Sequence, residues 1–360
     1  MITDPLPTID QSPIEKTENK KWLLVVVLIV LALTIGSGAF LLSSTNQLPS
    51  PTSTDQSNQT TPPQPQPTVK LPSEQLIWSG PNDILSIDIS PDGQQILLGI
   101  HEQGSYIIDT KSKKTVAVIP DLIGGSWSPD GQQLAFNGPW ISENDGQQLR
   151  QLDQGGYDVS WSTDGQKLAY IKYESNSLMI MDIPTGKTEE VITAEGLNAK
   201  PVWSPDGKEL LYSIGYIGGR WFAADLTKKT QVELTSDEDI ASYVAAWSPD
   251  GQWVAYDQNN GINLVDHKGG NRRVLTKDGF TPKWSLDNQS IYYQTKDLDK
   301  EGLPTFLWQI DIDGQNKKQI GPIEGINLAN QILWSPNDNQ VFVSSKTKTD
   351  YTIKLYSWVN

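Results

Sequence analysis

Residues 126–138 read SWSPDGQQLAFNG, and near-copies of this stretch recur six more times along the chain. In each copy a short polar turn is followed by an apolar segment. The third residue of the turn serves as a marker, and successive markers lie 34 to 50 residues apart. They are Asp92, Asp130, Asp164, Asp206, Asp250, Asp287 and Asn337. A repeat of about forty residues built from short strands is typical of one blade of a β-propeller.

The chemistry of the turn explains why the chain reverses direction at each copy. Ser begins the turn, Pro presets φ at about −65° in the second position, and Gly supplies the positive φ in the fourth. Thr163 and Leu286 stand in place of Pro. Asn288 and Asp338 stand in place of Gly, and both residue types tolerate the left-handed region. The sequence therefore predicts a hairpin at every copy without any metal or substrate.

Further strands complete the repeat. The apolar segment after the turn alternates large and small residues, as in Leu168-Ala169-Tyr170, which places neighbours on opposite sheet faces. We expect the small Ala to let adjacent blades approach while Phe or Tyr fills the opposite gap. Another apolar strand ends in Asp, as in LMIMD at 178–182, and leads into a fourth, such as EEVIT at 189–193. Four strands per repeat follow.

The two ends of the repeat region predict how the ring closes. The last copy supplies strands at 341–345 and 352–358 and is one strand short, whereas QLIWSG at 75–80 precedes the first turn without a repeat of its own. Pairing these ends removes the exposed edges of an open sheet. We therefore predict an all-β fold over 75–360, a seven-bladed β-propeller of four-stranded antiparallel blades closed by its N- and C-terminal strands.

A membrane anchor is predicted ahead of the propeller. Residues 22–42 are uncharged and apolar for 21 positions, which is enough to cross a hydrocarbon core and longer than the apolar part of a cleaved signal peptide. Three lysines, Lys16, Lys20 and Lys21, precede this transmembrane helix, and no cation follows until Lys70. The positive-inside rule then predicts a cytoplasmic tail at 1–21 and a propeller in the periplasm or extracellular space.

Composition describes the remaining parts of the chain. Residues 43–74 are rich in Ser, Thr, Gln and Pro, which predicts a disordered tether, with a proline-rich docking ligand as the alternative. The chain has no cysteine, which excludes disulfides and a cysteine-linked lipid anchor. Residues 75–360 contain 37 acidic and 24 basic residues. This excess of negative charge disfavours nucleic acid as a partner.

Six W-S-x-D/N turns behind a more divergent first copy make residues 75–360 resemble the TolB-like, WD-repeat-like β-propeller family. In that family the propeller is a docking platform for proteins of the bacterial envelope, or the gating domain before a prolyl-oligopeptidase-type hydrolase. The resemblance thus implies a protein- or peptide-binding or scaffolding module of the envelope. Only an anchor and a linker are predicted before the propeller, so the Tol–Pal role itself is not expected.

Enzyme signatures do not stand out in the sequence. A G-x-S-x-G elbow is missing, the sialidase spacing of Asp and Gly differs from that of these turns, and the two histidines, His101 and His267, are predicted to lie in solvated loops. The Asp-rich stretches at 297–302 and 311–314 do not continue as a calcium loop, and the second is predicted to be a turn. We expect no catalytic constellation, metal or cofactor, with a carboxylate-dependent hydrolase or lyase of cell-wall glycans or peptides as the alternative.

A binding face is predicted from the loop pattern of a propeller. Loops that join second to third strands, and loops that join one blade to the next, share the face at the mouth of the central channel. Aromatic and Arg side chains are common anchors of interfaces, although most loop residues only pack or are solvated. The candidate residues on this face are Trp140, Tyr157, Asp158, Tyr216, Arg220, Tyr243 and Phe280.

Overall fold

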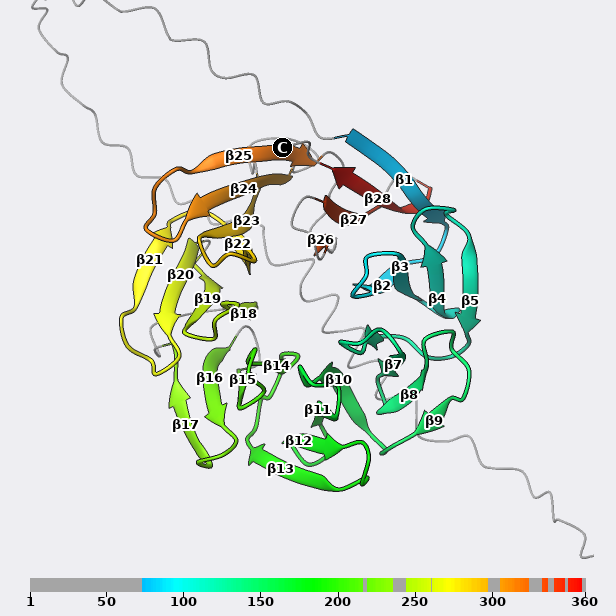
Figure 1. Ribbon diagram of the computed structural model, residues 1–360, viewed down its shortest axis with the longest axis horizontal. Coiled ribbons are helices and arrows are strands. Elements are labelled where there is room, and N and C mark those ends of the chain that lie inside the picture. The colour runs from blue at the N-terminus through cyan, green and yellow to red at the C-terminus, as the bar shows by residue number, and fades with distance from the viewer. Residues whose placement is uncertain are drawn as a thin grey trace, which may run out of the picture. The chain divides into compact units, whose positions relative to one another are not determined.

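The computed structural model of the chain describes residues 73–215, 219–235, 244–259, 261–296, 305–323, 332–335, 340–346 and 349–357. Within these ranges, 28 strands form seven four-stranded antiparallel sheets that are arranged as the blades of a ring (Figure 1). The predicted tail, anchor and most of the linker, residues 1–72, lie outside the described residues. Among those described, no helix has the length and apolar character needed to span a membrane.

In blades 1 to 6, consecutive strands of the chain follow one another from the inner to the outer edge. Blade 1 consists of β2 (Ile84–Ile89), β3 (Gln95–Ile100), β4 (Gly104–Asp109) and β5 (Thr115–Ile119). Blade 2 consists of β6 (Ser126–Trp127), β7 (Gln133–Phe136), β8 (Trp140–Glu143) and β9 (Arg150–Gln151). Blade 3 consists of β10 (Gly156–Trp161), β11 (Lys167–Lys172), β12 (Ser177–Asp182) and β13 (Thr188–Thr193). Blades 4 and 5 consist of β14 (Val202–Trp203), β15 (Glu209–Ile214), β16 (Arg220–Asp225) and β17 (Thr230–Glu233); and β18 (Ala245–Trp247), β19 (Trp253–Gln258), β20 (Gly261–Asp266) and β21 (Arg273–Thr276). Blade 6 consists of β22 (Phe280–Trp284), β23 (Ser290–Lys296), β24 (Thr305–Asp311) and β25 (Lys318–Ile323).

The seventh blade joins the two ends of the propeller, as the sequence predicts. It contains β26 (Ile332–Trp334), β27 (Gln340–Lys346) and β28 (Tyr351–Ser357) from the end of the chain. Its outermost strand is β1 (Ser73–Gly80), which pairs antiparallel with β28 (Figure 1). Ile77 of β1 is buried in a cluster with Phe342 and Ile353 of this blade and with apolar residues of blade 1. The ring is therefore closed by hydrogen bonds and by a shared apolar cluster.

One hydrogen-bond network recurs at the turn between the first two strands of the blades. The Ser hydroxyl donates to the marker carboxylate and accepts the main-chain N–H five residues later, and the same carboxylate accepts the N–H two residues beyond itself. Six copies have the hydroxyl–carboxylate bond, at 2.6–2.8 Å: Ser90–Asp92, Ser128–Asp130, Ser162–Asp164, Ser204–Asp206, Ser248–Asp250 and Ser285–Asp287. The seventh turn, with Asn337, lies outside the described residues. Asn288 adopts a φ of 61°, as its place in the turn requires.

Alternating side chains hold neighbouring blades together. Ala135 of blade 2 lies in one buried cluster with Tyr170 of blade 3, and Ala169 of blade 3 lies in the next with Tyr212 of blade 4. The small residue thus faces the following blade and the aromatic one faces the preceding blade. This confirms the expected pairing and fixes which sheet face each residue occupies. Close packing across each seam keeps the loops at both ends of the blades in fixed positions.

Candidate binding face

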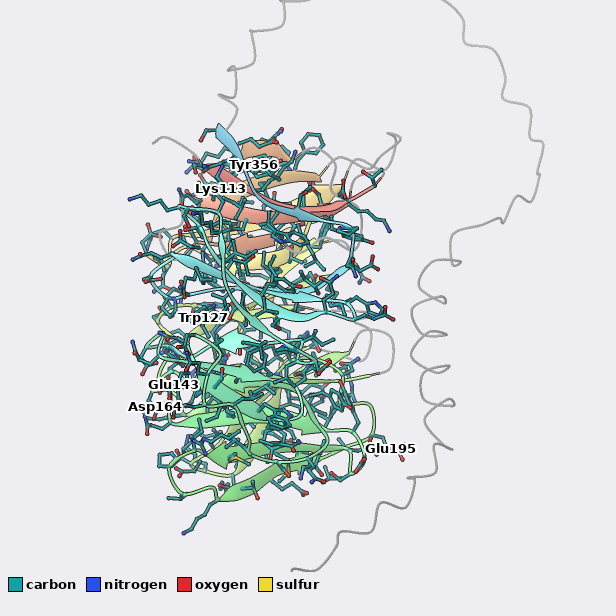
Figure 2. The ribbon with its side chains drawn as sticks, turned by 90° about the vertical axis from the view of Figure 1, so that its right-hand side faces the viewer. Lys113, Trp127, Glu143, Asp164, Glu195 and Tyr356 are labelled. Atoms are coloured by element: carbon teal, nitrogen blue, oxygen red, sulfur yellow. The ribbon has the colours of Figure 1, made fainter. Side chains whose placement is uncertain are left out.

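The propeller has two faces that differ in the loops they carry. The W-S-P-D-G turns and the turns between third and fourth strands form one face, which we call the turn face. The turns between second and third strands and the connections between blades form the other, the crossing face. Asp164 and Glu195 lie on these opposite faces (Figure 2). The candidate residues that the structure describes, Trp140, Tyr157, Asp158, Arg220 and Phe280, lie on the crossing face.

Tyr157, Asp158 and Tyr173 form a compact group on the crossing face of blade 3. The two tyrosine rings lie 5.4 Å apart between centroids at an interplanar angle of 32°. The Tyr173 hydroxyl donates to Asp158 Oδ2 at 2.8 Å. Burial and the nearby Asp158 carboxylate raise the pKa of Tyr173, so its hydroxyl remains a donor at neutral pH. Tyr157 is 47% exposed and Tyr173 is 37% exposed, so each presents an aromatic surface to solvent although its neighbours restrain it.

The preceding blade fixes the backbone beneath this group. Asp158 adopts a φ of 55°, and its N–H donates to Asn137 Oδ1 of blade 2 at 3.0 Å. The pairing of β10 with β11 is irregular between Tyr157 and Ser160, which turns this end of the inner strand. A bulge of this kind is a common way to redirect a side chain at the rim of a sheet. Tyr157 and Asp158 therefore occupy a position set by two blades.

A similar arrangement occurs where the chain enters blade 6. Thr281 has a φ of 52°, which is unusual for a β-branched residue, and its N–H donates to Asp257 Oδ2 of blade 5 at 3.2 Å. Oδ1 of the same carboxylate accepts the Val244 N–H at 3.1 Å. Phe280, a candidate residue, stands directly before Thr281 and is partly buried. The carboxylate of Asp257 thus joins two inner strands at the crossing face.

The remaining candidates are spread over the ring or are not described. Trp140 begins β8 and packs partly buried against the apolar cluster between blades 1 and 2. Arg220 of blade 4 pairs with Glu233 at 3.1 Å, and its guanidinium lies 5.5 Å from the centre of the Phe222 ring. Tyr216 and Tyr243 lie outside the described residues. Among the five candidates that the structure describes, Tyr157 and Asp158 join one group, through Tyr173.

Some polar residues of this face could not be identified from sequence alone. Tyr173 follows β11 and Asn137 follows β7, and neither carries a motif of its own. Their relation to Tyr157 and Asp158 depends on strand register and on the seam between blades 2 and 3. The sequence offers one signal for Asn137, which is the single Asn at the end of an apolar strand. A polar residue in this position needs a hydrogen-bond partner for its amide nearby.

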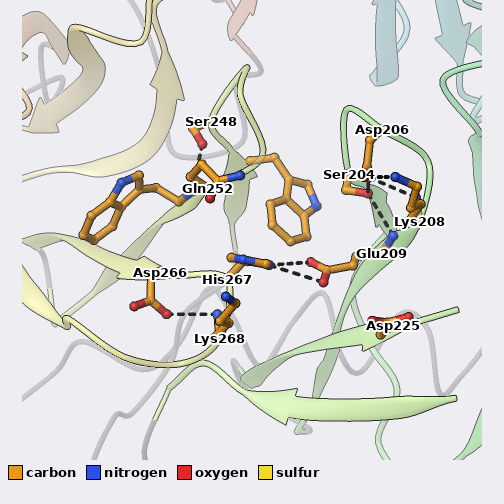
Figure 3. A network of polar contacts seen from close by, with 12 residues as sticks. Ser204, Asp206, Lys208, Glu209, Asp225, Ser248, Gln252, Asp266, His267 and Lys268 are labelled. Atoms are coloured by element: carbon orange, nitrogen blue, oxygen red, sulfur yellow. Dashed lines mark hydrogen bonds and ion pairs between the residues drawn. The ribbon is translucent and has the colours of Figure 1, made fainter. Parts of the chain in front are cut away.

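The turn face contains a cleft between blades 4 and 5 that the sequence does not predict, and Figure 3 shows the polar contacts of its side chains. It has a volume of about 520 Å³ and is lined by acidic, basic and imidazole side chains. His267 Nδ1 lies 3.1 Å from Glu209 Oε2 across the seam, and both side chains are largely buried. His267 lies in the turn after β20, as predicted, but the expectation that its ring is solvated is wrong, because the neighbouring blade covers most of the ring. Its partner lies 58 residues earlier in the sequence.

Most charged side chains of this cleft form hydrogen bonds or ion pairs within the turns that carry them. Asp206 accepts from Ser204 at 2.8 Å and pairs with Lys208 at 3.1 Å. Asp225 accepts the Lys228 ammonium at 2.6 Å, and this bond lowers the pKa of the Asp225 carboxyl. No set of three or more His, Asp or Glu side chains suited to a metal ion occurs among the described residues. The cleft is thus a charged, internally paired surface.

The Asp-rich stretch at 311–314 is a turn between the third and fourth strands of blade 6, as predicted. Gly314 N–H donates to the Asp311 carbonyl at 2.8 Å, and Asn316 donates its side-chain amide to Asp311 Oδ2 at 2.7 Å. Asp313 Oδ1 accepts the Gln315 N–H at 2.8 Å. These carboxylates satisfy neighbouring N–H groups. The other stretch, residues 297–302, lies outside the described residues.

Comparison with known proteins supports the repeat type and the fold. Residues 139–262 match the family model of the TolB beta propeller domain. An oligogalacturonate lyase solved in complex with manganese is 14% identical, with a TM-score of 0.63 over 80% of this chain and 94% of that chain. The oligogalacturonate lyase of Vibrio parahaemolyticus is 13% identical, with a TM-score of 0.62 over 80% and 95%. TolB from Acinetobacter baumannii is 18% identical, with a TM-score of 0.47 over 75% and 78%. The lyase likenesses show a shared propeller fold, and the family match places TolB-type repeats in this chain.

Proposed function

We propose that the chain is a membrane-tethered module that binds a protein or peptide through the crossing face of its propeller. The anchor predicted at 22–42 and the linker predicted at 43–74 would hold the propeller outside the cytoplasmic membrane, with the N-terminus in the cytoplasm. The observation that carries the proposal is the exposed and restrained pair Tyr157–Tyr173. The resemblance of the repeats to an envelope docking platform agrees with this role.

The physical argument concerns the entropy of binding. An aromatic side chain offers a large contact area, and a partner gains most from it when little side-chain freedom is lost on association. Tyr173 is bonded to Asp158, and Tyr157 packs on Tyr173, so both rings are restrained before a partner arrives. The Asp158 main chain is held in turn by Asn137. The group therefore meets the requirements of a preorganised interface anchor.

Site-specific crosslinking in intact envelopes tests this proposal. A photo-crosslinking amino acid replaces Tyr157 in the full-length chain, and the matched control replaces Val116, which is 54% exposed on the outer strand β5. We expect a discrete adduct from position 157 and none from position 116. Tyr173→Ala should weaken the adduct at position 157, because the ring beneath it is lost. Equal adducts from both positions would contradict docking at the crossing face.

A carboxylate-dependent enzyme is the second candidate, and one feature of the turn face favours it. Glu209 and Asp225 are register partners on β15 and β16, and both line the cleft that also contains His267. Two carboxylates near an imidazole could support acid–base chemistry on a glycan or peptide. Full-length protein should then turn over such a substrate, and Glu209→Gln should abolish the activity without loss of folding. Unchanged turnover in that variant would exclude this cleft as the catalytic site.

A further inference from the structure

Blade 5 contains a second pocket, at the crossing-face end of its strands. Its volume is about 530 Å³, and it lies where β19 turns into β20 beside the outer strand β21. Tyr256, Gln258 and Asn263 line it and are buried, the two carboxamide residues being 8% exposed each. Arg272 and Lys277 also line it and are exposed. The pocket thus combines buried polar groups with an exposed cationic rim.

One residue accounts for the space in this blade. Asn263 is the register partner of Tyr256, at a position where the third strand of five other blades carries a large apolar side chain. In blade 7 the position is Lys354, which pairs with Glu74. The five apolar residues are Tyr106, Trp140, Met179, Phe222 and Trp308. A short polar side chain in this row leaves unfilled volume where its counterparts are bulky.

The two carboxamide side chains of the pocket, Gln258 and Asn263, have no hydrogen-bond partner in the described part of the chain. Gln258 Nε2 is fully buried. A buried amide without a partner is unfavourable, so natural sites of this kind usually have a reason. Two adjacent carboxamides offer donors and acceptors in the combination that a peptide backbone requires.

The two exposed cations at the edge of the pocket, Arg272 and Lys277, also lack a carboxylate partner in the described part of the chain. Arg272 donates to the Glu233 carbonyl at 3.1 Å. The side chain of Glu233, whose carbonyl accepts from Arg272, pairs with Arg220. Asp278, which follows Lys277 in the sequence, pairs with Lys317. Arg273 is held over the Trp253 ring at 5.4 Å. A local positive charge therefore remains on a propeller whose overall charge is strongly negative.

From these observations we propose that the blade 5 pocket binds an acidic peptide segment of the partner. This inference rests on the proposed binding role of the crossing face. Arg272 and Lys277 would pair with carboxylates of the segment, since charge-assisted hydrogen bonds are strong where water is partly excluded. Gln258 and Asn263 would contact its backbone, and the exposed Val274 would pack against an apolar neighbour of the acidic residues. Hydrogen bonding, charge and apolar contact then converge on one ligand class.

Binding of defined peptides to the full-length chain in detergent tests this assignment. The probe is a fluorescent heptapeptide of alternating glutamate and valine, and its matched control contains glutamine in place of glutamate. Arg272→Gln and Lys277→Gln should each weaken binding roughly tenfold, as expected for one charge-assisted hydrogen bond. Asn263→Phe, which places the residue of blade 4 into blade 5, should block binding by filling the pocket. Lys268→Gln, an exposed change on the turn face of the same blade, should have no effect.

The outcomes separate this inference from the wider proposal. Equal affinity for the glutamine peptide would overturn it, because charge would not be recognised. Competition by inorganic phosphate without peptide binding would also overturn it and would indicate a site for small anions. Loss of peptide binding in Asn263→Phe with normal thermal unfolding supports it. If no peptide binds while the Tyr157 crosslink persists, the crossing-face function stands and the blade 5 assignment fails.

Discussion

The indole Nε1 of Trp203 donates a hydrogen bond of 3.2 Å to the main-chain carbonyl of Ser160, one blade earlier in the ring. The same bond joins Trp161, Trp247 and Trp284 to the inner strand of the preceding blade, at 3.1–3.2 Å. The tryptophan that precedes the turn is therefore a link between blades as well as an apolar residue of the core. Trp127 is an exception, because its buried Nε1 has no partner among the described residues.

This difference gives a test of the inter-blade bond. Trp203→Phe removes the donor of this inter-blade bond, whereas Trp127→Phe loses a similar amount of packing and no hydrogen bond among the described residues. We expect Trp203→Phe to reduce the free energy of unfolding by about 1 kcal/mol more than Trp127→Phe does. Chemical denaturation of both variants measures the difference. Equal losses would mean that the bond contributes little and that packing alone joins the blades.

Closure of the ring through β1 predicts a strong dependence on one side chain. Ile77 is 3% exposed in the cluster between blades 7 and 1, whereas its neighbour Leu76 is 49% exposed. Ile77→Ala should therefore lower the free energy of unfolding by about 2–4 kcal/mol. Leu76→Ala should change it by less than about 0.5 kcal/mol. Thermal and urea unfolding of the full-length variants provide the comparison, and similar values for both would show that β1 is not part of the cooperative ring.

The turn carboxylates predict a loss of stability in acid. The Ser162 hydroxyl, followed by the Gln166 N–H, lowers the pKa of Asp164 below its usual value of about 3.9. A carboxyl whose pKa is lowered by folding stabilises the protein above its unfolded pKa, and this contribution disappears as the pH falls through the folded value. Ser162→Ala should then reduce the free energy of unfolding at pH 7 by about 1 kcal/mol. It should also make the loss between about pH 4 and pH 2 shallower.

Thr163→Ala is the matched control for this turn, because Thr163 is exposed and its side chain makes no hydrogen bond among the described residues. We expect the control to keep both the stability and its acid dependence within about 0.5 kcal/mol of the parent protein. A pH profile of denaturation midpoints would show whether the two variants differ. If Ser162→Ala followed the control at every pH, the hydroxyl–carboxylate bond would not determine the behaviour of the turn.

The sequence predicted the architecture because the determinants of each blade are local. A turn with Ser, Asp and Gly in fixed places specifies its own hairpin, and Asn288 shows that the substitution of Gly follows the same rule. The binding surfaces depend instead on contacts between distant segments. Tyr157 meets Tyr173 through an irregular strand pairing, and His267 meets Glu209 across a seam. The unusual character of Asn263 becomes visible when the blades are compared in register.

Asp88 predicts the opposite dependence on pH from the turn carboxylates. It lies on the inner strand of blade 1, and its Oδ2 accepts the Trp127 N–H at 2.8 Å. Burial raises the pKa of Asp88, although the charge of Lys200 and this hydrogen bond act against the rise. An acid whose pKa is raised by folding stabilises the folded state below its unfolded pKa, and that contribution is lost as the pH rises through the folded value. Ionisation of the Asp88 carboxyl therefore lowers the free energy of unfolding as the pH rises.

Asp88→Asn should remove this loss of stability, because the amide is neutral and keeps an oxygen that can accept the Trp127 N–H. We expect the variant to unfold at pH 7 with a free energy equal to or up to about 1 kcal/mol above that of the parent protein. Its advantage should shrink as the pH falls toward about 4, where the parent carboxyl is protonated. Asp92→Asn in the same blade should do the reverse, since the Ser90 hydroxyl lowers the pKa of Asp92. Denaturation of both variants between pH 4 and pH 8 would distinguish them, and a loss in Asp88→Asn that grows toward neutral pH would show that the fold requires the ionised carboxylate beside Trp127.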